Sequence, residues 1–262
     1  MAFLECRGSC RGIDQLRLLM AAICQKQRSP QQHDQSQSMK LKQPLLAALW
    51  VLGLGHAAMA APPVTTMDPR SIGFTMATIA ADKLQFEAPT AQSSAGAPQF
   101  HEDEWRQIEF FPAARLPELQ TRLKEFKTFE QQNRVPQGWK NIYARRMAGA
   151  PLAGTPGPKE VAALLQGNMA PAPILTTTSA PLGQVKGGFT IRLTGSVFLY
   201  GIADGATVTS LAAMVERGGD ERVLTAAFIR LYTQYKLVLV DWRGQMLLTS
   251  VEPNGELGIW RP

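Results

Sequence analysis

Cysteine and histidine are scarce in this sequence, which contains three of each in 262 residues. All three cysteines (Cys6, Cys10 and Cys24) lie in the first 38 residues, and Cys6 and Cys10 lack the second pair that a zinc site needs. From residue 61 onward there is no cysteine and one histidine, His101. Disulfides and thiolate nucleophiles are therefore excluded from that part, and a Ser-His-Asp triad would have to use His101.

The sequence also lacks the motifs of several large enzyme classes. It contains no G-x-S-x-G, no G-x-x-x-x-G-K-[ST] and no G-x-G-x-x-G. Lys186-Gly187-Gly188 reads as a turn into a strand rather than a phosphate-binding loop. No cofactor and no metal site is predicted.

Residues 39–60, MKLKQPLLAALWVLGLGHAAMA, have the three parts of a secretory signal peptide. Lys40 and Lys42 precede an uncharged apolar run, which ends in small residues with a cleavage site between Ala60 and Ala61. An apolar run of about 12 residues is too short to cross ~30 Å of hydrocarbon permanently. We therefore expect a bacterial periplasmic or secreted protein, with no permanent membrane span after the signal is removed.

The 38 residues before this segment are expected to be an upstream mis-start or a disordered leader. Residues 25–38 are rich in Gln and Ser and poor in hydrophobic residues. Met39 is then the true initiator. The alternative is that residues 44–55 form a buried core helix, in which case the leader and its cysteines belong to the folded protein.

The charge gives no indication of nucleic-acid binding. The formal net charge of the whole chain is +6, but residues 1–60 hold seven basic and three acidic residues, so their removal lowers it to +2. The remaining chain has no run of basic residues. We expect no nucleic-acid partner.

Two segments rich in Ala, Pro, Gly and Ser divide the rest of the chain. Residues 61–100 are expected to be an extended N-terminal segment that ends in a linker. Residues 101–147 read as a strand-helix-strand unit, followed by a second linker at 147–158. Residues 148–262 read as an α+β region that could share one domain with that unit.

Hydrophobic periodicity predicts the elements of these regions. Leu116, Leu119, Leu123 and Phe126 are spaced by three and four, which indicates a helix between strands at 104–111 and 138–146. Further along, we predict these elements: a strand at 189–194, helices at 208–217 and 221–233, and strands at 235–242, 245–251 and 256–260. The expected fold is α+β, with an antiparallel sheet, helices on one face, and a C-terminal three-stranded meander preceded by a helical pair.

Seven residues are candidates for binding. Trp105, Trp139 and Tyr143, with Trp260, could form an aromatic platform for a glycan, although aromatic residues are more often sheet core. The other four are Asp241, Trp242, Arg243 and Arg145. Asp241, Trp242 and Arg243 could clamp a substrate at a strand end, although a turn is the simpler interpretation. Arg145 could contact an acidic partner, although a solvated surface position is the simpler interpretation.

One further cluster, His101-Glu102-Asp103-Glu104, could bind a cation loosely or act in acid-base catalysis. Neighbours on an extended chain point to opposite faces, so a solvated strand entry is the simpler interpretation.

These features favour a non-catalytic, secreted or periplasmic binding or accessory protein whose partner is an envelope protein or peptidoglycan. The alternative is a periplasmic hydrolase with two carboxyl groups roughly 5–9.5 Å apart in one cleft. Its candidate carboxylates are Glu104, Glu109, Asp204, Asp220 and Asp241.

Overall fold

The computed structural model describes residues 73–147 and 156–262. The predicted signal peptide, its cleavage site at Ala60–Ala61 and the three cysteines lie outside the described residues. The described chain has helices and a sheet dominated by antiparallel pairing, as the predicted α+β class requires.

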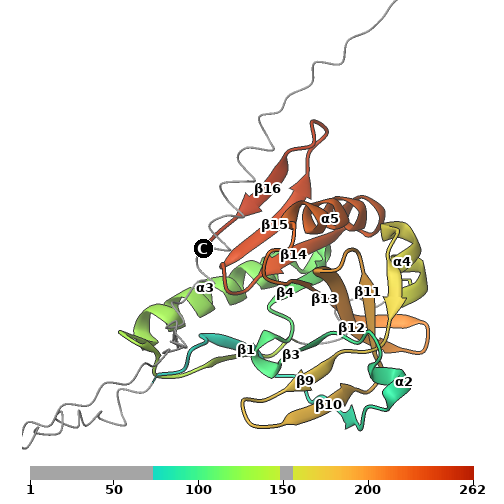
Figure 1. The fold of residues 1–262 in the computed structure, drawn as a ribbon. Coiled ribbons are helices and arrows are strands. Elements are labelled where there is room, and N and C mark those ends of the chain that lie inside the picture. Colours follow the sequence, from blue (N-terminus) through green and yellow to red (C-terminus); the bar gives the residue numbers. More distant parts are fainter. Residues whose placement is uncertain (1–72, 148–155) are drawn as a thin grey trace, which may run out of the picture.

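An eight-stranded, fully antiparallel sheet forms the centre of the fold (Figure 1). In spatial order its strands are β16 (Leu257–Trp260), β15 (Met246–Val251), β14 (Leu237–Asp241), β4 (Ile108–Pro112), β13 (Thr207–Val215), β12 (Val197–Asp204), β11 (Gly188–Arg192) and β8 (Asn168–Ala170). The last three strands in the sequence, β14, β15 and β16, pair in turn as the predicted meander.

Helices cover both faces of this sheet, so the prediction that they share one face is wrong. On β14, Leu237 and Leu239 pack in the core beneath α5 (Glu221–Tyr235), and α4 (Pro158–Leu165) contributes to that same core. Val238 and Val240 pack on the other side, beneath α3 (Leu116–Asn133). The alternation of one strand between two cores explains why KLVLV is apolar on both faces. No helix in the described ranges is both long and apolar enough to span a bilayer.

The predicted helix at 208–217 is strand β13 instead. Its Ala, Leu and Met residues favour a helix locally, but β13 pairs with β12 on one side and β4 on the other. One helix rather than a pair therefore precedes the meander. That helix, α5, begins as predicted at Asp220, whose carboxylate accepts from the amide of Arg222 at 3.0 Å.

A second, four-stranded sheet covers the rest of the α3 side. It consists of β2 (Phe86–Glu87), β10 (Pro181–Val185), β9 (Ile174–Thr176) and β3 (Gln99–His101). Its Leu175 and Val185 pack against Phe198, Tyr200 and Ala212 of the large sheet. The predicted linker before residue 100 includes the short helix α2 (Ala91–Ser94), which opens with Thr90 as a capping residue.

Two predicted strands are shorter than expected. The strand predicted at 104–111 is β4 alone, because Glu102–Glu104 form a 3-10 turn and Arg106 has a φ of 54°. The strand predicted at 138–146 is broken into β6 (Gly138–Trp139) and β7 (Tyr143–Arg145).

The N-terminal part of the described chain docks onto these pieces. β6 pairs with β5 (Arg134–Val135), and β7 pairs in parallel with β1 (Thr78–Ala80). The backbone of Phe74 and of β1 therefore pairs with the segment that follows α3, while Ala77 packs in the core beneath α3.

Candidate functional site

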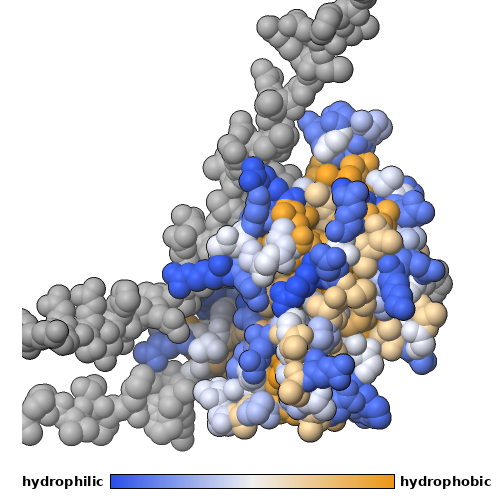
Figure 2. Space-filling model, turned by 45° about the vertical axis from the view of Figure 1, so that its right-hand side comes forward, coloured by the Kyte–Doolittle hydropathy of each residue, from blue (hydrophilic) through white to orange (hydrophobic). Residues whose placement is uncertain are grey.

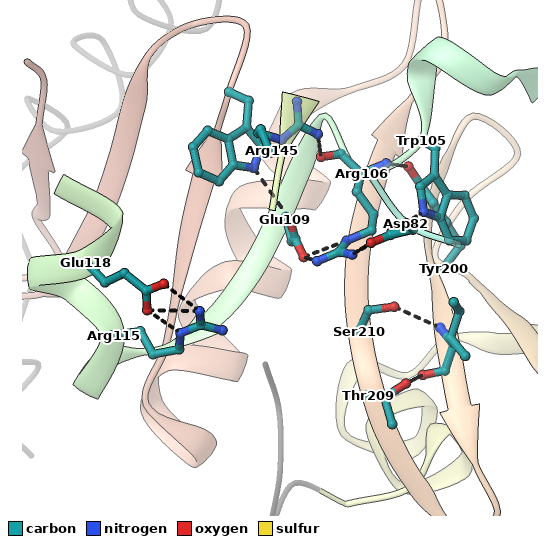
Figure 3. Close-up of polar contacts among 12 residues, drawn as sticks. Asp82, Trp105, Arg106, Glu109, Arg115, Glu118, Arg145, Tyr200, Thr209 and Ser210 are labelled. Carbon is teal, nitrogen blue, oxygen red and sulfur yellow. Dashed lines mark hydrogen bonds and ion pairs between the residues drawn. The ribbon is translucent and has the colours of Figure 1, made fainter. Parts of the chain in front are cut away.

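Arg106, two residues before β4, lies between the carboxylates of Asp82 and Glu109 (Figure 3). Its Nη1 is 2.6 and 2.5 Å from the two oxygens of Asp82, and its Nε donates to Glu109 Oε1 at 2.7 Å. The side chains of Arg106 and Glu109 are 9% and 1% exposed. One guanidinium thus neutralises carboxylates from two segments, the loop after β1 and the middle of β4.

A second buried cation, Arg145 of β7, lies beside this pair. Its Nη2 donates to the carbonyl of Arg106 at 2.8 Å, and its Nη1 donates to Thr78 Oγ1 at 2.9 Å. Its Cζ lies 5.0 Å from the centre of the Trp242 ring, and the indole N–H of Trp242 points to Glu109 Oε2 at 3.4 Å. Arg145 therefore joins β7, β1 and the turn after β14. We refer to Asp82, Arg106, Glu109 and Arg145 as the ion network.

The charges of the ion network balance, with two cations and two carboxylates in a mostly buried setting. Burial lowers the pKa of Arg145 to about 9, and the charge of Glu109 opposes that shift. Burial also disfavours the charge on Arg106, but the ion pairs with Glu109 and Asp82 outweigh it and raise its pKa. For Glu109, burial raises the pKa and Arg106 opposes the rise. Buried charges are tolerated when they are paired and hydrogen-bonded, and this set meets that condition.

Aromatic side chains hold the turn that carries Arg106. Tyr200 Oη accepts from the amide of Arg106 at 2.8 Å and donates to the carbonyl of Glu104 at 3.1 Å. The indole N–H of Trp105 donates to Asp82 Oδ2 at 2.8 Å. Burial raises the pKa of Tyr200, which stays a neutral phenol. These bonds hold Arg106 in a conformation with positive φ, which residues other than glycine rarely adopt.

The predicted clamp Asp241-Trp242-Arg243 forms a tight turn whose side chains diverge. Asp241 Oδ1 accepts from the amide of Gly244 at 2.8 Å, and Trp242 is fully buried. Arg243 instead pairs with Glu104 at 2.7 Å. Asp241 Oδ2 is buried and has no hydrogen-bond partner among the described residues, and burial raises the pKa of Asp241.

The five carboxylates proposed for a hydrolase lie in different settings. Glu109 shares a face of the sheet with Val240 and Trp242, whereas Asp241 lies between those two on its strand and points to the opposite face. Glu104 pairs with Arg243 and Asp220 caps α5. The fifth candidate, Asp204, is exposed at the end of β12.

Trp139 and Tyr143 both pack against the core beneath α3, and the backbone of Phe74 pairs with that of Trp139. The amide and carbonyl of Phe74 bond to those of Trp139 at 2.7 and 3.0 Å, and the Phe74 side chain is 48% exposed. The Tyr143 ring centre lies 5.3 Å from that of Phe126, and Arg134 lies over the Trp139 ring at 5.0 Å. We call Phe74, Trp139 and Tyr143 the aromatic corner. Trp105 and Trp242, by contrast, are buried and offer no open ring face.

The remaining sequence cluster, at His101, is a local cap. His101 Nδ1 accepts from the amide of Asp103 at 3.3 Å, and Nε2 lies 3.4 Å from Thr178 Oγ1. Within 73–147 and 156–262, no group of three or more His, Cys, Asp or Glu side chains is arranged to hold a metal ion.

Sequence reasoning missed Asp82, Arg106 and Tyr200. One usable sign was Glu109, a carboxylate directly before two phenylalanines on a predicted buried strand, which implies a cationic partner. Arg106 is only three residues away, but in the predicted strand 104–111 it would point to the opposite face from Glu109. Nothing local indicated that Asp82 would join them. No family model, curated protein or solved structure matches this chain.

Proposed function

We propose that this protein is a non-catalytic, exported binding or accessory protein, and that it contacts an envelope protein or peptidoglycan through the aromatic corner. The exposed Phe74 ring carries the proposal. Two hydrogen bonds to Trp139 fix the main chain at Phe74. Gly138 must remain a glycine for the two segments to come this close, because an added Cβ would lie 2.1 Å from the carbonyl oxygen of Phe74. An apolar ring held outward in this way suits recognition of a surface.

The ion network supports a non-catalytic role. Glu109, one of the carboxylates considered for the alternative hydrolase, is buried and paired with the guanidinium of Arg106. A substrate would have to displace a guanidinium to reach Glu109. The network is better suited to joining β1, β4 and β7 than to chemistry.

The aromatic corner has the chemistry for either class of partner. Phe74 offers an exposed ring for a sugar or an apolar side chain, and Tyr143 adds a hydroxyl that already donates to Glu125 at 3.2 Å. Arg134, exposed over Trp139, adds a positive charge for acidic groups.

A photoreactive amino acid at Phe74 tests this proposal directly. In the exporting host it should crosslink to one envelope protein, or the protein should co-sediment with purified peptidoglycan and lose that binding in Phe74→Ala. The matched control is Met169, a similarly exposed apolar residue (44%) on the edge strand β8. Equal crosslinking at both positions, or unchanged binding by Phe74→Ala, would refute the aromatic corner as the contact surface.

The proposed export has its own test. The intact mass of the protein recovered from the periplasmic fraction should correspond to a chain that begins at Ala61. A cytoplasmic protein that keeps residues 1–60 would overturn export and return the three cysteines to consideration.

A further inference from the structure

Within the described residues, the large sheet has two edge strands, which differ in length and in the residues they present. β8, at one end, has three residues and is followed directly by Pro171, which has no N–H to offer. β16, at the other end, is Leu-Gly-Ile-Trp, one residue longer, with neither a charge nor a proline inside the strand; Arg261 and Pro262 follow it. Among the described residues, β16 pairs only with β15. Edge strands without charge or proline are the usual sites at which sheets join.

The side chains of β16 give this edge an apolar face on the α5 side. Ile259 pairs with Leu248 and Leu257 pairs with Val251, and a register shift in β15 keeps both pairs on that face. Ile259 is 41% exposed and Leu257 is half-buried. In Figure 2, apolar surface lies directly beneath the hydrophilic tip of this hairpin.

The strand is complementary to itself. When two copies of β16 pair as antiparallel neighbours about a two-fold axis through Gly258, each Leu257 faces the Ile259 of the other copy. Both pairs then lie on the α5 side, because such an axis is perpendicular to the sheet and keeps equivalent faces together. Gly258 faces Gly258 between them, so the pairing places no side chains against each other at the axis.

We propose that β16 is a self-association edge, through which two copies of this chain join their large sheets into one continuous antiparallel sheet. The contact consists of main-chain hydrogen bonds along Leu257–Trp260 and two Leu257–Ile259 pairs, one on each side of the axis. It lies on the meander, whereas the aromatic corner lies at the end of α3, so this proposal does not depend on the proposed partner.

The sedimentation behaviour of the full chain tests the proposal. Over a wide range of concentrations, analytical ultracentrifugation should show a monomer-dimer equilibrium. Ile259→Lys should raise the dissociation constant of the dimer by roughly tenfold or more, because a charge is placed on the shared face. Met169→Lys, the same change at the β8 edge, should leave the constant unchanged.

Hydrogen exchange provides a second measurement that needs no variant. The amides of Leu257–Trp260 that point away from β15 should become protected as the concentration rises, whereas those of β8 should not. A protein that stays monomeric, or a dimer that Met169→Lys disrupts and Ile259→Lys does not, overturns the proposal. Protection of β16 at every concentration would also overturn it, since the edge would then be covered by the same chain.

Discussion

The Cζ atom of Arg145 lies 5.0 Å from the centre of the Trp242 ring, and both side chains are buried. A desolvated cation over an indole contributes about 2 kcal/mol in favourable cases. Here the contact also joins distant parts of the chain, since Arg145 belongs to β7 and Trp242 follows β14. The N-terminal strand β1, paired to β7, is thereby fixed to the centre of the fold.

Glu109→Gln should destabilise the protein strongly. The change leaves two buried guanidinium groups with Asp82 as their remaining carboxylate, and breaking a buried pair typically costs about 3–5 kcal/mol. Urea unfolding measures the loss. The control is Glu118→Gln, which removes the charge from a more exposed pair with Arg115 and should cost less than about 1 kcal/mol. Similar losses in the two variants would show that the ion network contributes no more than a surface pair.

Ionisation of Asp241 should make the protein less stable as the pH rises above about 3.9, the pKa of an aspartate in the unfolded chain. Burial raises its pKa in the folded state, so between the unfolded value of about 3.9 and the higher folded value the native state binds more protons and unfolding becomes easier with increasing pH. Asp241→Asn removes that contribution. Glu109 shifts in the same direction, so the measurement is the difference between wild type and variant in urea unfolding across this pH range. A difference that stays constant with pH would contradict the prediction.

Gly138→Ala should release the aromatic corner. The residue has a φ of 135°, and an added Cβ would collide with the carbonyl oxygen of Phe74. Exchange of the Phe74 and Trp139 amides should accelerate, and the melting temperature should fall. Gly255→Ala is the matched control, because its φ is also positive (83°) but nothing lies within 4 Å of the added Cβ. It should cost roughly 1–2 kcal/mol from the backbone alone, with the Phe74 amide unaffected. Equal effects on the Phe74 amide would refute the steric explanation.

The elements that could be predicted are those that a local sequence pattern marks, such as a hydrophobic stripe or a capping residue. The stripe Leu119, Leu123 and Phe126 identified α3, and Asp220 marked the start of α5. β13 could not be predicted in this way, because its helix-forming residues become a strand only through pairing with β12 and β4.

The candidate site was less predictable for the same reason. Arg145 was selected as a surface contact, yet it is buried against Trp242, some hundred residues away in the sequence. Asp82 and Arg106 are 24 residues apart and carry no shared periodicity. Which charges neutralise each other depends on the parallel pairing of β1 with β7, and nothing in either segment alone specifies it.

The position of β4 between β13 and β14 also sets a condition on the order of folding. Residues 108–112 are made about a hundred residues before the first of the two strands that flank them, 207–215 and 237–241. The middle of the sheet therefore cannot close until residues 237–241 have left the ribosome. Contacts so far apart in sequence are formed slowly, so the centre of the sheet stays open for longer than the local elements around it, such as α3 and the β14–β15–β16 meander.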